Sequence, residues 1–283
     1  MNKKIQTVAL AVTEMDKYLR SKYDYNSNLK LWENTFIKHQ IEKRKNNHSF
    51  DVSDHIRAMV YSMLSSGISW ERVESSIDIY TGKITAIDEV FFNYDVNSLM
   101  KSSSNDLRNR IKALNCASQS TLKQMNALLE HNIAKLLSYE TEYGSVDNYY
   151  SKFIDIDNTF KTLLTSLSSL SGKDKMKEMG IALNAEYLRN VGYDIAKPDR
   201  HIRRILGSKI LGCSDNEIVS EFEALDIVKA IADTLHKTTA ETDYILWSYC
   251  AKGYGEVCTA NKPKCDKCIS IKICNISKEN KNG

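Results

Sequence analysis

Residues 258–274 read C-T-A-N-K-P-K-C-D-K-C-I-S-I-K-I-C, and this stretch governs the interpretation of the whole chain. It places four cysteines at the spacing C-x6-C-x2-C-x5-C: Cys258, Cys265, Cys268 and Cys274. Four thiolates in one short loop can surround a single metal centre, either an iron–sulfur cluster or a zinc ion. Small zinc folds more often use two close cysteine pairs, whereas this loop has one such pair with a long arm on each side. The spacing therefore favours a [4Fe-4S] cluster over zinc, and over redox-active thiols or a disulfide pair.

Length and charge add a second constraint. The chain has 283 residues, of which 42% are hydrophobic and 27% charged, with a net charge of +3. This length suits one large domain or two modest ones. Positive charge is concentrated late, because residues 197–204 carry four basic side chains against one acid and residues 252–278 carry six lysines against two acids. This placement fits a phosphate-facing surface, with an ordinary solvated face as the alternative.

The remaining cysteines bear on the cellular compartment. Cys116, Cys213 and Cys250 are isolated in the sequence, which indicates reduced thiols and a cytoplasmic protein, associated with the nucleoid in a prokaryote. The apolar run near the N-terminus is too short for a signal peptide and has no clean cleavage site. No stretch approaches the length of a membrane helix, so we expect no membrane partner.

The chain is expected to be mostly helical. Its only prolines are Pro198 and Pro263, and it has no clear hairpin turns. An N-terminal helical piece at about 5–40 is followed by a polar loop and by a helix with Ser53 or Asp54 as its N-cap. Further helices are predicted at about 70–80, 84–92, 95–100, 104–113, 119–137, 146–155 and 158–169.

Residues 172–189, G-K-D-K-M-K-E-M-G-I-A-L-N-A-E-Y-L-R, predict a helix, a tight hairpin and a second helix. A hairpin with Gly180 at its tip exposes backbone N–H groups and a helix N-terminus, which are good ligands for phosphate. Residues 192–204 then read G-Y-D-I-A-K-P-D-R-H-I-R-R. Asp199 follows a proline that fixes the chain direction, so it is expected to cap a short helix.

The cysteine loop resembles, Cys for Cys, the [4Fe-4S] loop of the endonuclease III class of helix-hairpin-helix DNA glycosylases. The approach through residues 244–247 and 253–255 is similar to that family, and residues 261–264 match its basic, proline-containing insert. Asp199, His201 and Ile202 match the family's catalytic stretch. The resemblance covers residues 50–274 and is strongest after Met176, whereas residues 1–49 match nothing in the family.

The resemblance implies an all-α, two-domain helix-hairpin-helix glycosylase fold. Residues 1–49 would pack with the C-terminal domain, residues 50–195 would form a bundle of about six helices with the hairpin at 173–190, and residues 196–283 would carry Asp199 and the cluster. The implied enzyme is a monomeric hydrolase of base-excision repair that binds double-stranded DNA and flips out a damaged or modified base. Asp199 would stabilise the oxocarbenium-like sugar and orient water.

The family's other functional positions are carried over residue by residue. Ala182 stands where the family hairpin usually has a second glycine, and Asn184 stands where bifunctional members have the lysine that forms a Schiff base. We therefore expect a monofunctional glycosylase. The expected DNA contacts are Gly180, Ile181, Ala182, Arg200, Lys262 and Lys264; the expected substrate pocket is Ser65, Ser66 and Trp70; and the expected wedge loop is Asn115, Cys116 and Gln119.

Three alternatives remain open at the level of sequence. The first is a bifunctional glycosylase/AP lyase with a lysine elsewhere, such as Lys173, Lys175 or Lys177. The second is a non-catalytic DNA-binding protein that keeps the cluster as a structural clip. The third is a zinc-bound member of the same family.

Overall fold

A computed structural model describes residues 2–23, 29–65, 74–157 and 159–275, and within these ranges the regular elements are helices, with no strand. The expected all-α class is confirmed. The chain divides into two compact units, Met1–Lys38 with Asp194–Gly283, and His39–Tyr193. No helix in the described ranges has the length and apolar character needed to cross a membrane.

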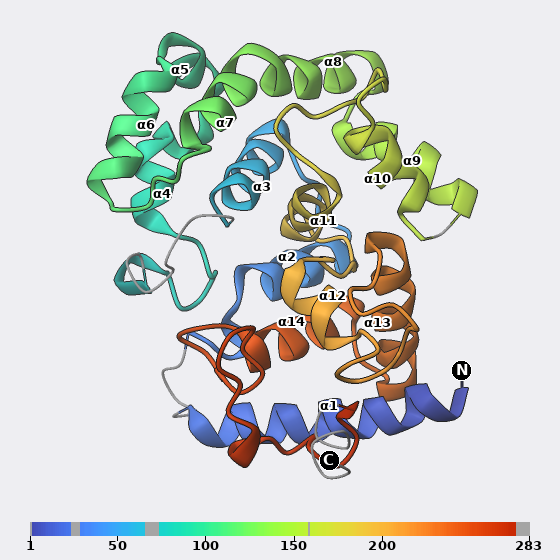
Figure 1. Ribbon diagram of the computed structural model, residues 1–283. Coiled ribbons are helices and arrows are strands. Elements are labelled where there is room, and N and C mark those ends of the chain that lie inside the picture. The colour runs from blue at the N-terminus through green and yellow to red at the C-terminus, as the bar shows by residue number, and fades with distance from the viewer. Residues whose placement is uncertain (1, 24–28, 66–73, 158, 276–283) are drawn as a thin grey trace. The chain divides into compact units, whose positions relative to one another are not determined.

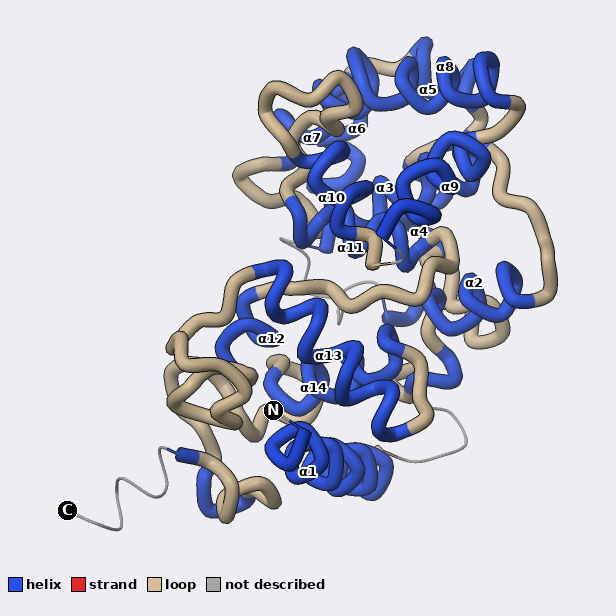
Figure 2. The backbone as a smooth tube through the Cα atoms, turned by 90° about the vertical axis from the view of Figure 1, so that its right-hand side faces the viewer, coloured by secondary structure: helices blue, strands red, loops and turns tan. Residues whose placement is uncertain are grey.

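The first unit joins the N-terminal helix to the last helices of the chain. Helix α1 (Asn2–Lys22) packs against α13 (Glu221–Leu235) and α14 (Thr239–Cys250) (Figure 2). It does so because a stripe at helical spacing is buried, namely Val8, Val12, Met15 and Leu19. The short helix α12 (Arg200–Ile205) packs against α14.

The second unit is centred on α3 (Val52–Ser65), which packs against α11 (Ile181–Asn190) (Figure 1). The other helices of this unit are α2 (Phe36–Lys45), which begins in the first unit, α4 (Thr85–Val90), α5 (Val96–Lys101), α6 (Ser104–Ala113), α7 (Thr121–Ala127), α8 (Ile133–Tyr143), α9 (Val146–Asp157) and α10 (Lys161–Ser168).

The expected boundary after residue 49 differs from the observed one. Residues 39–49 belong to the second unit, where the Arg44 guanidinium binds the Asp147 carboxylate at 2.9 Å.

Several predicted helix limits are wrong, each for a local reason. The cap of α3 is Asp51, whose carboxylate accepts the backbone N–H of Asp54 at 2.8 Å, so the helix begins earlier than expected. The piece expected at 5–40 is interrupted, because α1 ends at Lys22 and α2 begins at Phe36. Of the helix expected at 70–80, the described part is a 3-10 turn, Glu74–Ser76, followed by a tight turn. The Asp78 carboxylate closes that turn by accepting the N–H groups of residues 80 and 81.

The helix expected at 119–137 contains a π-helical segment. Residues Leu128–Asn132 form this segment between α7 and α8. Asn132 is fully buried, and its side-chain amide bonds to both backbone groups of Lys177, at 2.9 and 3.1 Å. These bonds satisfy the backbone N–H and C=O groups of Lys177, although this residue is not in a helix.

The first hairpin helix is also absent, since residues 172–180 form turns between α10 and α11. Asp174 draws this loop inward, because its buried carboxylate accepts hydrogen bonds from Tyr139, Tyr149 and Ser166 at 2.6–3.1 Å. Lys173, Lys175 and Lys177 therefore lie on a loop held by side chains from α8, α9 and α10, rather than on a helix.

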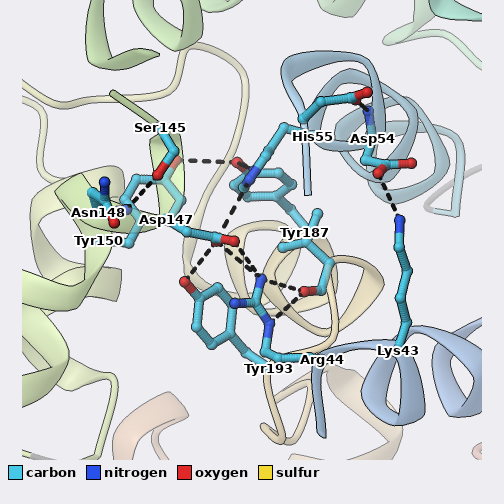
Figure 3. A network of polar contacts seen from close by, with 12 residues as sticks. Lys43, Arg44, Asp54, His55, Ser145, Asp147, Asn148, Tyr150, Tyr187 and Tyr193 are labelled. Atoms are coloured by element: carbon cyan, nitrogen blue, oxygen red, sulfur yellow. Dashed lines mark hydrogen bonds and ion pairs between the residues drawn. The ribbon is translucent and has the colours of Figure 1, made fainter. Parts of the chain in front are cut away.

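A polar network fixes the far end of α11 (Figure 3). The buried His55 ring contacts the Tyr187 hydroxyl of α11 at 2.6 Å and the Asp147 carboxylate at 3.6 Å. Arg44 donates both to Asp147 and to the carbonyl of Val191, just after α11 ends. Burial raises the pKa of Asp147, but His55 and Arg44 outweigh it and hold that pKa well below its usual range. The second hairpin helix is thus anchored by charge as well as by apolar packing.

Candidate functional site

Asp199 lies at the start of α12 in the first unit, as expected. Its Oδ1 accepts the backbone N–H groups of His201 at 2.7 Å and of Ile202 at 3.1 Å, which makes it the N-cap. No hydrogen bond to Oδ2 is found among the described residues. The side chain is half-buried behind a buried Pro198. The carboxylate is therefore held in place through one oxygen.

The opposite end of α12 contacts the cysteine loop. Arg204 donates from Nη1 to the Cys258 sulfur at 3.7 Å and from Nη2 to the Cys258 carbonyl oxygen. The buried Ile202 and Ile205 anchor the same helix in the apolar interior. One short helix thus carries Asp199 at its first end and, at its other end, a contact to the first cysteine of the loop.

The four loop cysteines line one cavity of about 100 Å³ within the first unit. The remainder of its lining is largely apolar and includes Met15, Ile210 and Val257. None of the four takes part in a disulfide bond. The loop therefore brings cysteines 16 positions apart in sequence, 258 and 274, to the lining of one cavity.

Hydrogen-bond donors surround these sulfurs. The Tyr249 hydroxyl donates to the Cys268 sulfur at 3.5 Å. A hydrogen bond with Cys250, together with the charge of Arg204, lowers the pKa of the Cys258 thiol to about 6 even though burial opposes the change. A thiolate is the form of cysteine that binds metals.

The residues present fit an iron–sulfur cluster or another thiolate-bound metal by their chemistry. Among the described residues, no three His, Cys, Asp or Glu side chains are already arranged around a common metal position. The thiols thus line one cavity without yet converging. The donor set of four cysteines in one cavity, with hydrogen bonds to two of the sulfurs, is compatible with such a group, and the metal site stays a prediction.

The expected basic contacts lie at the surface of the first unit. Arg200, Lys262 and Lys264 are exposed. Lys264 forms an ion pair with Glu256 at 3.1 Å, so part of its charge is compensated within the loop. The positive charge of Lys262 is therefore less compensated within the loop than that of Lys264.

The hairpin tip lies in the second unit. Gly180 is exposed and precedes α11, while Ile181 and Ala182 are half-buried in its first turn. No side chain caps this helix, and a Cβ built on Gly180 would meet nothing within 4 Å. The backbone N–H groups of the first turn are therefore open to a ligand from outside.

Asn184, which stands where the resemblance would place a lysine, is fully buried. Its Nδ2 donates to the carbonyl oxygens of Leu167 and Met179, both at 3.2 Å, and to the Ser168 hydroxyl at 2.9 Å. The residue thus ties α11 to the end of α10 and to the hairpin loop. It supplies no amine, and the position has a structural role of its own.

The expected pocket and wedge residues have mixed outcomes. Ser66 and Trp70 lie outside the described residues, and the Ser65 hydroxyl bonds to the Ser62 carbonyl of its own helix at 2.7 Å. In the expected wedge loop, Asn115 and Gln119 are exposed. Cys116 is only 1% exposed and is excluded as a wedge, because its thiol packs into the interior.

The sequence analysis missed Arg204, Tyr249 and Cys250 as contacts of the cysteine loop. Arg204 was visible only as part of a basic run. Tyr249 and Cys250 end a buried helix and resemble ordinary core residues. Nothing in the sequence spacing relates these positions to particular cysteines, because the contacts depend on how α12 and α14 pack.

Gly255 provides a stability prediction for this loop. A Cβ at this position would lie 2.9 Å from the Ser248 carbonyl oxygen and 3.0 Å from the Tyr249 Cα, so the loop can approach α14 only with glycine here. We expect Gly255→Ala to lower the free energy of unfolding by about 1–3 kcal/mol, measured by denaturant titration. Gly180→Ala is the matched control and should change the free energy of unfolding by less than about 0.5 kcal/mol, because the poorer capping by alanine is offset by the reduced freedom of the unfolded chain. Equal stability of the two variants would contradict the packing of the loop on α14.

Comparison of the chain with protein-family models, with curated proteins and with solved structures found no match.

Proposed function

We propose that this chain is a helix-hairpin-helix DNA N-glycosylase that hydrolyses the bond between a damaged or modified base and deoxyribose, and that it carries a [4Fe-4S] cluster. One observation carries the proposal. Four cysteines at C-x6-C-x2-C-x5-C line a single cavity, and a single helix extends from their first member to a capping aspartate. The all-α class is compatible with this family's fold.

Asp199 is the proposed catalytic carboxylate. When the glycosidic C1′–N bond breaks, positive charge develops on the sugar and the base leaves with the bonding electrons. A fixed carboxylate stabilises that charge and orients a water, whose oxygen bonds to C1′ while its proton passes to solvent and the departing base takes up a proton from solvent. Asp199 has suitable features, because Oδ1 is engaged by two backbone N–H groups and Oδ2 accepts no hydrogen bond from the described residues.

The proposed ligands of the cluster are Cys258, Cys265, Cys268 and Cys274. A bound cluster would supply a covalent cross-link between residues that are otherwise joined only by loop. Within this chain, Arg204 orients Cys258 and links it to the helix that Asp199 caps. Asp199 and the cysteine loop are therefore both attached to α12.

The proposed DNA contacts use backbone and charge. The open first turn of α11 at Gly180 offers N–H groups to phosphate, and Ile181 and Ala182 are the next residues of that turn. Arg200, Lys262 and Lys264 offer exposed positive charge. These contacts bind any sequence, so base selection requires other residues.

The decisive experiment is a panel of duplexes, each with one damaged or modified base. The protein should convert one or more of them to abasic sites, seen as strand breaks that form only after alkali. Strand breaks without alkali would indicate the bifunctional alternative. Binding without excision on every duplex would favour a non-catalytic DNA-binding protein.

Borohydride trapping tests the absence of lyase chemistry. We expect no covalent protein–DNA complex on a cognate duplex, because Asn184 cannot form a Schiff base. A trapped complex would point to Lys173, Lys175 or Lys177 of the hairpin loop. Alanine variants of each lysine would then identify the nucleophile.

Salt dependence tests the basic loop. We expect Lys262→Ala and Lys264→Ala each to reduce the slope of log affinity against log salt by about one. Each variant neutralises one phosphate fewer, so its binding releases about one counterion fewer from DNA. Lys229→Ala is the control, since Lys229 is exposed on α13 and is not one of the proposed DNA contacts. An unchanged slope in both loop variants would show that the cysteine loop does not contact phosphate.

A further inference from the structure

The last turn of α14 supports the cysteine loop through its backbone. The Tyr249 carbonyl oxygen accepts the N–H groups of Val257 at 3.0 Å and of Cys258 at 3.2 Å, and the Ser248 carbonyl oxygen accepts that of Gly255 at 2.8 Å. Carbonyl groups at a helix end have no partner within the helix. Here the loop supplies those partners, and its first cysteine is fixed to α14 in the process.

Two side chains continue this support at the sulfur atoms. The Tyr249 hydroxyl donates to the Cys268 sulfur at 3.5 Å and accepts the N–H of Ile269 at 3.1 Å. Arg204 of α12 donates from Nη1 to the Cys258 sulfur at 3.7 Å. Tyr249 is fully buried and Arg204 is half-buried. Two of the four candidate ligands, far apart in the loop, thus each accept a hydrogen bond from a helix of the same unit.

The Tyr249 ring has little freedom to move away. It packs edge to face against Tyr18 of α1, with ring centroids 5.8 Å apart at an interplanar angle of 78°. Its hydroxyl bonds both to a sulfur and to the backbone one residue later. A hydroxyl held in this way keeps its donor on the sulfur, even when the loop adjusts around a metal.

We propose that Tyr249 and Arg204 are positioning residues that hold the Cys268 and Cys258 sulfurs and raise the reduction potential of the cluster. This rests on the proposed cluster. Reduction adds negative charge that is shared with the ligand sulfurs, and a hydrogen bond donated to a sulfur stabilises that charge. Removing a donor therefore makes reduction harder and shifts the midpoint potential to a more negative value.

The test compares cluster-loaded Tyr249→Phe with the wild-type protein by voltammetry and by the rate at which a chelator removes iron. We expect a more negative midpoint potential and faster iron loss. Tyr18→Phe is the matched control, because it deletes a hydroxyl from the neighbouring ring, which contacts the Tyr249 ring and no loop sulfur. The control should keep the wild-type potential. An unchanged potential and iron-loss rate in Tyr249→Phe would overturn the proposal.

A second comparison covers the case in which Tyr249→Phe does not fold. Arg204→Lys keeps a charged donor and Arg204→Met removes it, so only the methionine variant should shift the potential downward. The same potential in both variants would overturn the proposal at this position. A wild-type protein that binds no iron would instead remove the proposed cluster itself, before any variant is compared.

Discussion

Asp199→Asn abolishes base excision in our expectation, with DNA binding unchanged or tighter. The amide removes the negative charge that an oxocarbenium-like sugar requires, which costs on the order of 10²–10³ in rate. Asparagine caps helices as well as aspartate does, so the hydrogen bonds to His201 and Ile202 can be kept. Single-turnover excision on a cognate duplex, together with a binding isotherm, separates the loss of chemistry from a loss of affinity.

A matched control exists in the other unit. Asp95 caps α5 by accepting the N–H of Ser98 at 2.8 Å. Asp95→Asn makes the same chemical change at a helix cap and should leave excision at the wild-type rate. Excision at that rate by Asp199→Asn as well would reduce Asp199 to a plain cap and remove the proposed mechanism.

Cys265→Ser is expected to have the second large effect. Anaerobically purified wild-type protein should be yellow-brown with about four irons per chain, and the variant should lose colour and solubility. A serine hydroxyl stays protonated near neutral pH and is a poor substitute for a thiolate. The measurements are the iron content and the visible absorption spectrum.

Cys213→Ser is the control for that experiment. Cys213 is a free thiol of the same unit that does not line the cavity, and burial raises its pKa to about 11. The control should retain iron. A colourless wild-type protein with one zinc would contradict the cluster, as would equal iron in both variants.

Local chemistry made part of this structure predictable. The helical class followed from the scarcity of proline and turn sequences, and the cap at Asp199 followed from a carboxylate directly before a short amphipathic run. The catalytic and cluster assignments came from motif order and stay predictions. The exposure of Gly180 was expected from its place at a hairpin tip.

Long-range side chains explain what the sequence did not reveal. The hairpin loop does not form a first helix because side chains distant in the chain hold it. Asn132 bonds to the backbone of the loop, and Asp174 of the loop accepts hydrogen bonds from Tyr139 and Tyr149. The cap of α3 was misplaced because three polar residues within four positions, Asp51, Ser53 and Asp54, each compete for that role. The roles of Tyr249 and Arg204 depend on packing that periodicity does not encode.

The burial of Asn184 constrains how this chain can change its chemistry. Its amide holds two carbonyl oxygens and a hydroxyl at the junction of α10, the hairpin loop and α11. A lysine at this position would place a longer, charged side chain in a fully buried site, where its ammonium group could not reproduce the geometry of the amide's hydrogen bonds. A single substitution would therefore lose hairpin order before it gained a usable amine. Under the proposed function, neighbouring residues would have to change first, so acquiring lyase chemistry would take more than one mutational step.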